Sequence, residues 1–435
     1  MLPPRAVAAR SCLIKLLPSI CAPRGKLLAH PRALASGARG ASMSTSARID
    51  ATDTPCIVAM QQMLRGKTDV LSLAQGIVHW PPPAEALSAA QAAVLETTTS
   101  LYGADDGLPE LRAALKEKVQ KENGLVASEI MVTAGANQAY TNLVLSLTDA
   151  GDATLLFRPY YFNHLMALQM TGSAREVVLP ASTAELQPDM VALRNEFESR
   201  AATGLPPLKM VTLVNPGNPT GVMIPHATLE EAKDLCAQYG AWLVVDNTYE
   251  NFAYKGCTPH KCVEGPHVVN IFSFSKAYGM MGWRVGYLAF PSALGEQLFK
   301  TQDTIIICPS TLSQKLALAA LREGASFVAN QIAALAEQKE VILEALSPLG
   351  EGAVQGGSGA IYLFCKLPAG CEDDKEVVRW MVEKHGVCLI PGSACGMPGH
   401  VRVCYANLPL ERSREAAKRL KAALLELTSG SAQIK

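Results

Sequence analysis

Short apolar segments alternate with longer amphipathic segments over most of this chain, and this alternation constrains the fold more than any other feature. Six short apolar runs are typical of buried strands: Met131–Thr133, Thr154–Phe157, Met210–Val214, Trp242–Val245, Val268–Phe272 and Val285–Phe290. Helical patterns cover Pro109–Glu122, Gln138–Leu147, Leu229–Tyr239 and Val328–Leu346. Strands that alternate with helices build a mainly parallel sheet with helices on both faces. We therefore expect an α/β protein built on such a sheet.

Beyond the long helix predicted over Val328–Leu346, the pattern changes to that of a smaller α+β unit. Its predicted strands are Ala360–Leu367, Val387–Ile390 and His400–Tyr405, and its predicted helices are Asp373–Lys384 and Glu411–Leu427. We place an N-terminal arm and a large domain at residues 50–325 and a small C-terminal domain at residues 326–435. No run of eighteen apolar residues is present, so we expect no membrane span.

The first 49 residues differ in composition from the rest. They contain eight basic residues and no Asp or Glu, which leaves 31 basic against 39 acidic residues in the remainder. A leader rich in Arg, Ala and Ser is typical of an organelle transit peptide, and we expect a mitochondrial destination in preference to a chloroplast. The alternative is a cytoplasmic protein with a disordered tail and a second start at Met43. The acidic remainder argues against a nucleic-acid partner.

Twelve cysteines are spread over the 435 residues without a Cys-x-x-Cys pair, and we interpret them as thiols in a reducing compartment. Cys257 and Cys262 flank His260, which resembles part of a metal site. No second cluster completes a four-ligand set, so we expect no metal.

Residues 273–286, with the sequence SFSKAYGMMGWRVG, carry the most chemical information. A lone lysine is usually a solvated surface charge. Lys276, however, follows an apolar strand and precedes a glycine-rich turn, where a solvated lysine would be unusual. Partial burial there would lower its pKa and free the amine as a nucleophile towards an aldehyde.

This segment closely resembles the lysine signature of the class I and II aminotransferases, which are pyridoxal 5′-phosphate enzymes of fold type I. The resemblance implies that Lys276 forms the Schiff base with the cofactor. It also implies that Ser273 and Arg284 bind the cofactor phosphate, a task that suits a bidentate guanidinium.

Residues 244–249, with the sequence VVDNTY, place an acid at the end of an apolar strand. Such a carboxylate faces the ligand crevice of an open parallel sheet, although a turn or helix-capping aspartate is an equal alternative on this segment alone. In the family resemblance Asp246 pairs with the pyridine nitrogen and keeps the ring an electron sink. Tyr249 matches the tyrosine that hydrogen-bonds the phenolic oxygen of the ring.

Three further segments complete the cofactor site that the resemblance implies. In residues 215–221, NPGNPTG, Asn218 matches the amide that reaches the phenolic oxygen and the substrate carboxylate. In residues 133–138, TAGANQ, a helix begins after a strand and offers free backbone amides, which implies that Ala136 and Asn137 bind phosphate. Tyr161 aligns with the aromatic side chain that stacks on the pyridine ring, with a core or rim tyrosine as the alternative.

The resemblance, which runs from about Leu73 to Asn407, also assigns substrate and subunit contacts. Arg402 matches the fork for the substrate α-carboxylate, a geometry that lysine could not reproduce. Gly76 and Trp80 lie where the substrate side chain enters. Tyr102 matches a tyrosine that reaches the phosphate of the neighbouring subunit, so we expect a homodimer with shared active sites.

The sequence therefore predicts an aminotransferase that moves an amino group from an amino acid to a 2-oxo acid by a ping-pong mechanism. Residues 73–80 look most like the plant aromatic and methionine aminotransferases, and Ile77, Trp80 and Tyr362 favour a large neutral donor. Pyruvate and phenylpyruvate are the expected acceptors. An aspartate-type enzyme is an alternative if Arg112 or Arg158 swings into the site.

The predicted fold also supports two functions other than amino transfer. It hosts lyases that act on S-adenosylmethionine, such as aminocyclopropane carboxylate synthases. A cofactor-binding regulator related to fused transcription factors would be a non-enzymatic protein. It is disfavoured because no DNA-binding module or basic body accompanies the predicted fold.

Overall fold

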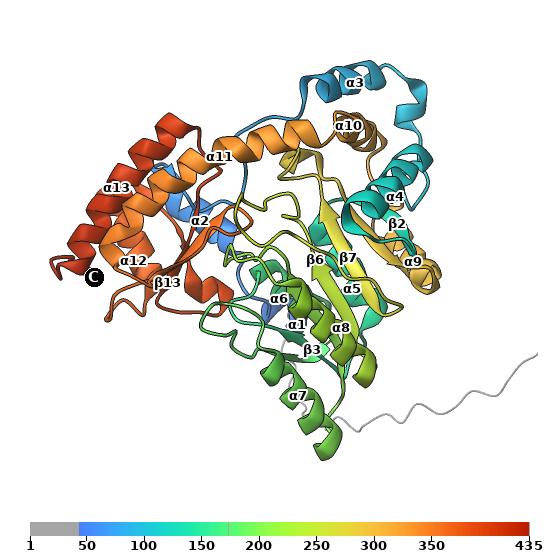
Figure 1. Ribbon diagram of the computed structural model, residues 1–435, viewed down its shortest axis with the longest axis horizontal. Coiled ribbons are helices and arrows are strands. Elements are labelled where there is room, and N and C mark those ends of the chain that lie inside the picture. Colours follow the sequence, from blue (N-terminus) through green and yellow to red (C-terminus); the bar gives the residue numbers. More distant parts are fainter. Residues whose placement is uncertain (1–42, 173, 435) are drawn as a thin grey trace, which may run out of the picture. The chain divides into compact units, whose positions relative to one another are not determined.

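A seven-stranded sheet forms the centre of the fold, with the strand order β2-β8-β7-β6-β5-β3-β4 (Figure 1). The computed structural model describes residues 43–172 and 174–434. The strands are β2 (Ser128–Thr133), β3 (Asp152–Leu156), β4 (Ala174–Val178), β5 (Leu208–Val214), β6 (Trp242–Asp246), β7 (Val268–Ser273) and β8 (Gly286–Pro291). Strand β8 runs antiparallel to β2 and β7, and the other neighbours are parallel. The predicted mainly parallel sheet is confirmed.

Helices cover both faces of this sheet because successive side chains of its strands are apolar on both sides. In β6, Leu243 and Val245 pack into a core with α7 (Met190–Thr203) and α8 (His226–Tyr239). Val244 points the other way, into a core with α5 (Ala136–Leu147) and α6 (Phe162–Thr171). The remaining helices of this part are α3 (Ala84–Val94), α4 (Pro109–Asn123), α9 (Gly295–Ile306) and α10 (Thr311–Arg322).

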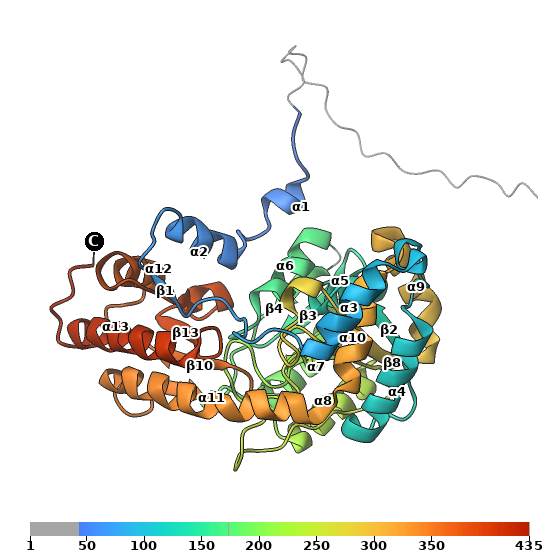
Figure 2. The same cartoon turned by 90° about the horizontal axis from the view of Figure 1, so that it is seen from above.

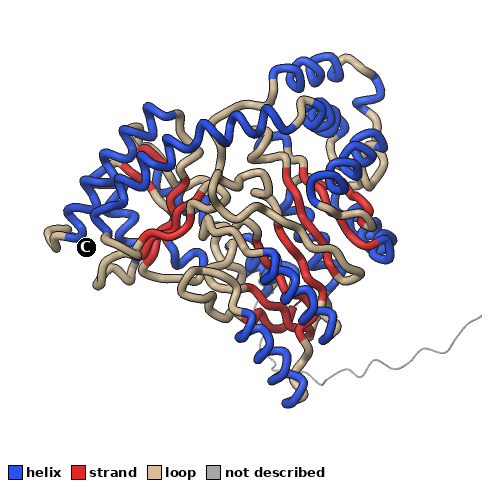
Figure 3. Tube along the Cα trace, viewed as in Figure 1, coloured by secondary structure: helices blue, strands red, loops and turns tan. Residues whose placement is uncertain are grey.

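A second sheet has the order β12-β13-β10-β9 and is antiparallel throughout. Its strands are β9 (Val354–Gly356), β10 (Tyr362–Lys366), β12 (Ile390–Pro391) and β13 (His400–Cys404), and Figure 3 shows them apart from the larger sheet. Helix α11 (Ala325–Leu346) runs from α10 towards this sheet and lies beside α13 (Leu410–Thr428) in both views (Figures 1 and 2). The smaller α+β unit is therefore present, as predicted.

Two predicted elements of the smaller unit differ from the structure. The expected strand Val387–Ile390 is two strands, because β11 (Val387–Cys388) pairs in parallel with β1 (Leu71–Ser72) and only β12 joins the second sheet. The expected helix Asp373–Lys384 is α12 (Asp374–Trp380) followed by a π-helical turn at Met381–His385. The arm that contains β1 thus lies against the C-terminal part of the chain, beside α12 and α2 (Cys56–Leu64) (Figure 2).

Most of the predicted leader, residues 1–42, lies outside the described residues, and its last residues fall at the start of α1 (Ala47–Asp50). Within the part of the chain that the structure describes, no helix is both long and apolar enough to cross a membrane.

Candidate active site

A cavity of about 310 Å³ lies at the carboxyl ends of β5, β6 and β7, next to the starts of α5 and α6. Parallel strands place their last residues at one edge of the sheet, which is where open α/β sheets bind ligands. Thirteen of the fifteen predicted site residues line this cavity: Gly76, Ile77, Ala136, Asn137, Tyr161, Asn218, Asp246, Tyr249, Ser273, Lys276, Arg284, Tyr362 and Arg402. The topology of the sheet therefore brings most of the predicted site residues together around one cavity.

Lys276 follows β7 and faces the cavity. Burial is the main reason that its pKa falls to about 8, and the positive charges of Arg284 and Arg402 act in the same direction. About a tenth of this amine is consequently uncharged at pH 7, far more than for an ordinary lysine, and the uncharged amine is the form that attacks an aldehyde.

Asp246 is the buried last residue of β6. Its Oδ2 lies 3.2 Å from His164 Nε2, and its Oδ1 accepts a hydrogen bond from the Thr248 amide at 2.9 Å. Burial alone would raise the pKa of this carboxyl, but the hydrogen bond and charge of His164, together with the Thr248 amide, lower it. Tyr140 stacks on His164 at 4.0 Å and fixes the imidazole. Asp246 therefore presents a carboxylate to the cavity.

Arg402 on β13 is a cation that is 1% exposed and has no carboxylate partner among the described residues. Its Nη1 donates to Asn218 Oδ1 at 2.8 Å and its Nη2 donates to the Ala74 carbonyl at 2.7 Å. Its Nε is buried without a hydrogen-bond partner. The guanidinium also lies 4.4 Å from the ring centre of Tyr362, whose hydroxyl contacts that of Tyr249. A buried, underpaired guanidinium is suited to binding an anion from the cavity.

Another part of the cavity wall offers hydrogen-bond donors suited to a phosphate group. Helix α5 begins at Ala136 with no side chain capping its first turn, so its amides and its dipole face the cavity. Gly135 has φ of 86°, and a Cβ there would lie 2.3 Å from Arg284 Nη2, so glycine lets the guanidinium approach the helix start. With the Ser273 hydroxyl, these donors fit a phosphate dianion.

Two predicted residues do not line this cavity. Trp80 is buried behind it, where its Nε1 donates to the Ala277 carbonyl at 3.3 Å and so supports the segment that carries Lys276. Tyr102 is 82% exposed on the surface of the chain. The proposed contact of Tyr102 with a second subunit and the substrate role of Trp80 stay predictions.

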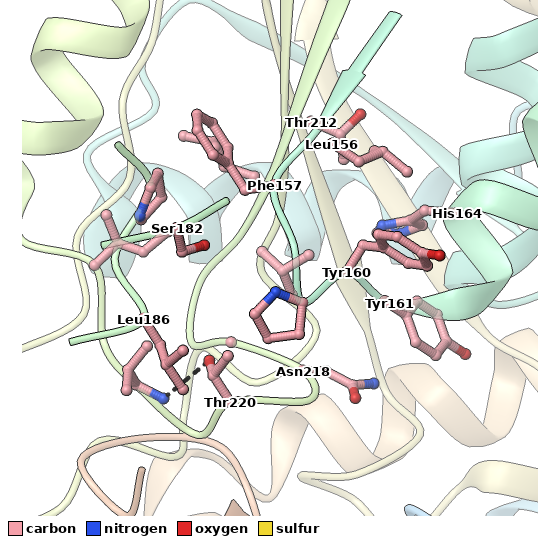
Figure 4. Close-up of a pocket in the computed structure, with 17 residues that line it drawn as sticks. Leu156, Phe157, Tyr160, Tyr161, His164, Ser182, Leu186, Thr212, Asn218 and Thr220 are labelled. Carbon is pink, nitrogen blue, oxygen red and sulfur yellow. Dashed lines mark hydrogen bonds between the residues drawn. The ribbon is translucent and has the colours of Figure 1, made fainter. Parts of the chain in front are cut away.

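The cavity wall also contains residues that the sequence analysis did not assign: Ile57, Gln75, Phe162, Asn163, Val214, Thr248, Ser275 and Met281. His164 was missed as well, because nothing in the local sequence links it to Asp246. A smaller cavity of about 50 Å³ shares Tyr161 and Asn218 with this one, and Figure 4 shows His164 close to Tyr161 on its wall. His164 therefore stands between this smaller cavity and Asp246.

Comparison with known proteins agrees with this geometry. Residues 68–420 match the family "Aminotransferase class I and II", and the chain belongs to this family. It is 47% identical over 385 residues to the aromatic aminotransferase ISS1 of Arabidopsis thaliana, covering 88% of this chain and 96% of that protein. It is 30% identical to an aspartate/prephenate aminotransferase of Thermus thermophilus, covering 86% of this chain and 97% of that protein.

A solved structure of Thermus thermophilus aspartate aminotransferase with maleate has a TM-score of 0.79 and 29% identity, covering 88% of this chain and all of that one. The protein is accordingly a fold-type-I transaminase that depends on pyridoxal phosphate and acts on amino acids and oxo acids.

Different residues of the cavity would serve different steps of amino transfer. When bound, pyridoxal phosphate supplies an aldehyde and an electron-withdrawing ring. The start of α5, Ser273 and Arg284 would hold its phosphate, and Asp246 would hold its ring nitrogen. Arg402 and Asn218 would bind and orient the substrate carboxylate. The neutral amine of Lys276 would accept a proton at Nζ and its charged form would return one, which is general acid–base catalysis.

Proposed function

We propose that the enzyme transfers the amino group of a large neutral amino acid, aromatic or methionine, to a 2-oxo acid such as pyruvate or phenylpyruvate by a ping-pong mechanism. The charge of the cavity wall carries this proposal. Among the described residues, the basic side chains on the wall are those of Lys276, Arg284 and Arg402. In the mechanism given above, Lys276 would bind the cofactor aldehyde, Arg284 the cofactor phosphate and Arg402 the substrate α-carboxylate. Apolar and aromatic side chains make up much of the remaining wall: Ile57, Ile77, Phe162, Met281 and Tyr362.

Neither arginine of the aspartate-type alternative lines the cavity. Arg112 forms an ion pair with Asp106 and donates to the Ile130 carbonyl at 3.1 Å, so its charge is engaged elsewhere, and Arg158 lies outside the wall. A second carboxylate on the substrate would then be desolvated without a cation from this chain, which is costly. The name of the Arabidopsis thaliana relative, an aromatic aminotransferase, supports the same substrate class.

The aspartate-type alternative has support of its own, because the relative from Thermus thermophilus is named an aspartate/prephenate aminotransferase. Specificity constants for tryptophan, phenylalanine, tyrosine, methionine and aspartate, measured with several 2-oxo acids, separate the two. We expect the neutral donors to lead. A tenfold preference for aspartate, about 1.4 kcal/mol in the transition state, would contradict the neutral-donor proposal. Release of methylthioadenosine from S-adenosylmethionine without amino transfer would favour the lyase.

We also propose that residues 1–49 direct the protein to an organelle, with the mitochondrion favoured over the chloroplast. The absence of acidic residues in this segment supports the proposal. A fluorescent reporter fused behind residues 1–49 should enter the organelle, and the same reporter behind residues 43–49 should not. A reporter that stays in the cytosol in both cases would instead support a cytoplasmic protein that starts at Met43.

The active unit, we propose further, is a homodimer in which each subunit completes the other's site. The exposed position of Tyr102, away from the cavity of its own chain, supports this arrangement.

A further inference from the structure

The turn that follows β6 presents its side chains in two directions. Asp246, Thr248 and Tyr249 line the cavity. Asn247 and Glu250 do not, and both are held by polar groups behind the turn. The polar groups behind the turn therefore control where the cavity-lining side chains lie.

Both carboxylate oxygens of Glu250 are bound by side chains of α4. Its Oε1 accepts a hydrogen bond from Lys118 Nζ at 2.5 Å, and its Oε2 accepts one from Asn123 Nδ2 at 2.7 Å. Lys118 also donates to Asn123 Oδ1 at 2.9 Å, so the three side chains form a closed triangle. The Lys118 ammonium lies 5.1 Å from the ring centre of Phe272 on β7. The side chains of Lys118 and Glu250 are only 8% and 9% exposed.

The other end of the turn is fixed independently. Asn247 donates to Asn270 Oδ1 at 2.9 Å and contacts His260 Nε2 at 2.9 Å. Burial lowers the pKa of His260 to about 4, so the imidazole is neutral at pH 7 and its Nε2 can donate to Asn247 Oδ1. With Asn247 held, Glu250 is the second anchor of the short segment that contains Tyr249.

A buried ion pair is weak evidence for stability, because desolvation of both charges offsets much of their attraction. Its geometry, in contrast, is well defined, since each charge loses much free energy if its partner moves away. We propose that Glu250, bound by Lys118 and Asn123, is a positioning residue that holds the Tyr249 hydroxyl at the cavity, beside the Tyr362 hydroxyl. The proposal rests on the predicted contact between Tyr249 and the cofactor.

Three variants of the full chain test this assignment. Lys118→Met keeps the apolar stem and leaves Glu250 buried without its cation, Glu250→Gln keeps the size and removes the charge, and the double variant removes both charges. Lys116→Met is the matched control, since Lys116 lies on the same helix and pairs with Glu129 at 3.0 Å, where both side chains are about 40% exposed. The readouts are amide hydrogen exchange over residues 247–251 with and without cofactor, the pH profile of the cofactor's visible absorbance, and the kinetic constants.

Lys118→Met should speed exchange over residues 247–251 by about tenfold or more, because the local structure opens more often. It should also shift the pH profile of the cofactor's absorbance. We expect kcat to fall on the order of tenfold while KM stays within about twofold, because a displaced Tyr249 hydroxyl would affect the reacting part of the cofactor and not the binding of the substrate. The double variant should recover part of the protection because no lone charge remains buried. Lys116→Met should match the parent.

Equal exchange over residues 247–251 and equal absorbance profiles in Glu250→Gln, Lys118→Met and Lys116→Met would overturn the proposal. Faster exchange with an unchanged absorbance profile would overturn the link to Tyr249, while transamination itself would still be present in every variant. If Lys118→Met does not fold, Glu250→Gln carries the same comparison, since its side chain has nearly the same shape.

Discussion

Lys276 and Asp246 are both enclosed by protein, and burial alone shifts their pKa values in opposite directions. Burial favours the neutral form of either group, so it lowers a lysine pKa and raises an aspartate pKa. For Lys276 the nearby charges of Arg284 and Arg402 add to that effect. For Asp246 the contact with His164 reverses it. As a result the cavity offers a reactive amine and a charged carboxylate at the same pH.

The amine of Lys276 should titrate well below an ordinary lysine. Its pKa is lowered to about 8, so its reductive methylation by formaldehyde in the cofactor-free protein should rise with pH and reach half its maximum near pH 8. In denaturant the midpoint should return to about 10.4. Peptide mass mapping measures the labelling. The folded chain binds fewer protons than the unfolded chain between these two values, so this group's contribution to stability rises with pH across that window. A folded-state midpoint above 10 would contradict the assigned environment.

The sequence predicts the residues that stand in contiguous motifs and misses those that act through space. Lys276, Asp246 and Asn218 each lie in a contiguous segment that matches a motif of the family. His164 reaches Asp246 only because α6 packs beside β6, and no local pattern encodes that contact. The contact between the Tyr249 and Tyr362 hydroxyls is of the same kind, since it joins the large sheet to the second one.

At the scale of elements, the junction between β2 and α5 provides the backbone amides and the space for Arg284 that would bind the cofactor phosphate. Gly135 turns the chain with a positive φ and leaves room for Arg284, whose own φ of 56° directs its side chain towards the helix start. The two segments meet because β2 and β8 are paired, with Thr133 opposite Gly286. Strand pairing thus brings a helix N-terminus and a guanidinium to the same point.

Gly135→Ala should therefore weaken cofactor binding as well as stability. The backbone of Gly135, with φ of 86° and ψ of 166°, lies in a region that is essentially restricted to glycine and costs an alanine about 1–3 kcal/mol. In addition the new Cβ displaces Arg284, so the dissociation constant for the cofactor should rise on the order of tenfold, the lower end expected for a charged hydrogen bond. Urea unfolding and absorbance titration measure the two effects. Gly240→Ala is the control, because Gly240 has φ of 70° and no atom near its Cβ position. Equal cofactor affinity in both variants would remove Gly135 and Arg284 from the phosphate site.

The predicted elements succeed where burial is continuous and fail where it is not. Strands β5, β6 and β7 are apolar runs buried on both faces, and their predicted bounds differ from the observed ones by at most two residues. Strand β4 went unpredicted because it is a sheet edge that mixes charged and apolar residues, as edge strands do. The division of Val387–Ile390 into β11 and β12 depends on two different partners, β1 and β13, which a single segment cannot reveal.

At the scale of the whole molecule, the site is assembled from segments far apart in the chain. Arg402 on the second sheet binds Asn218 from the loop after β5 and the Ala74 carbonyl from the N-terminal arm. The pairing of β1 with β11 holds that arm in place. The family resemblance could predict these residues because it carries the arrangement of the whole fold, whereas composition and periodicity predict only the local elements.

The arrangement of subunits in the proposed dimer determines whether Tyr102 acts within its own chain or in a second one. The family resemblance implies that Tyr102 reaches the phosphate site of the partner in a symmetric dimer, and its 82% exposure outside the cavity wall of its own chain supports this proposal. Subunits carrying Tyr102→Phe and Lys276→Ala separately are expected to form mixed dimers with one doubly altered site and one intact site. With random exchange, about a quarter of all sites should be intact, and transaminase activity and cofactor retention should recover to that extent.

Placing both substitutions on one chain and mixing it with the parent chain gives the opposite expectation. In such a mixed dimer the parent's Lys276 receives Phe at position 102 from its partner, so neither site is intact if Tyr102 acts across the dimer. If Tyr102 acts within its own chain, the parent site stays intact in this mixture, whereas no mixed dimer of the separate variants contains an intact site. Cofactor retention after dialysis, measured in both mixtures at equal subunit ratios, therefore decides between the two arrangements. After random exchange, about half of all sites in the second mixture should stay intact if Tyr102 acts within its own chain, but only about a quarter, those of the parent homodimers, if it acts across the dimer. Intact sites at about half in the second mixture and none in the first would contradict shared active sites.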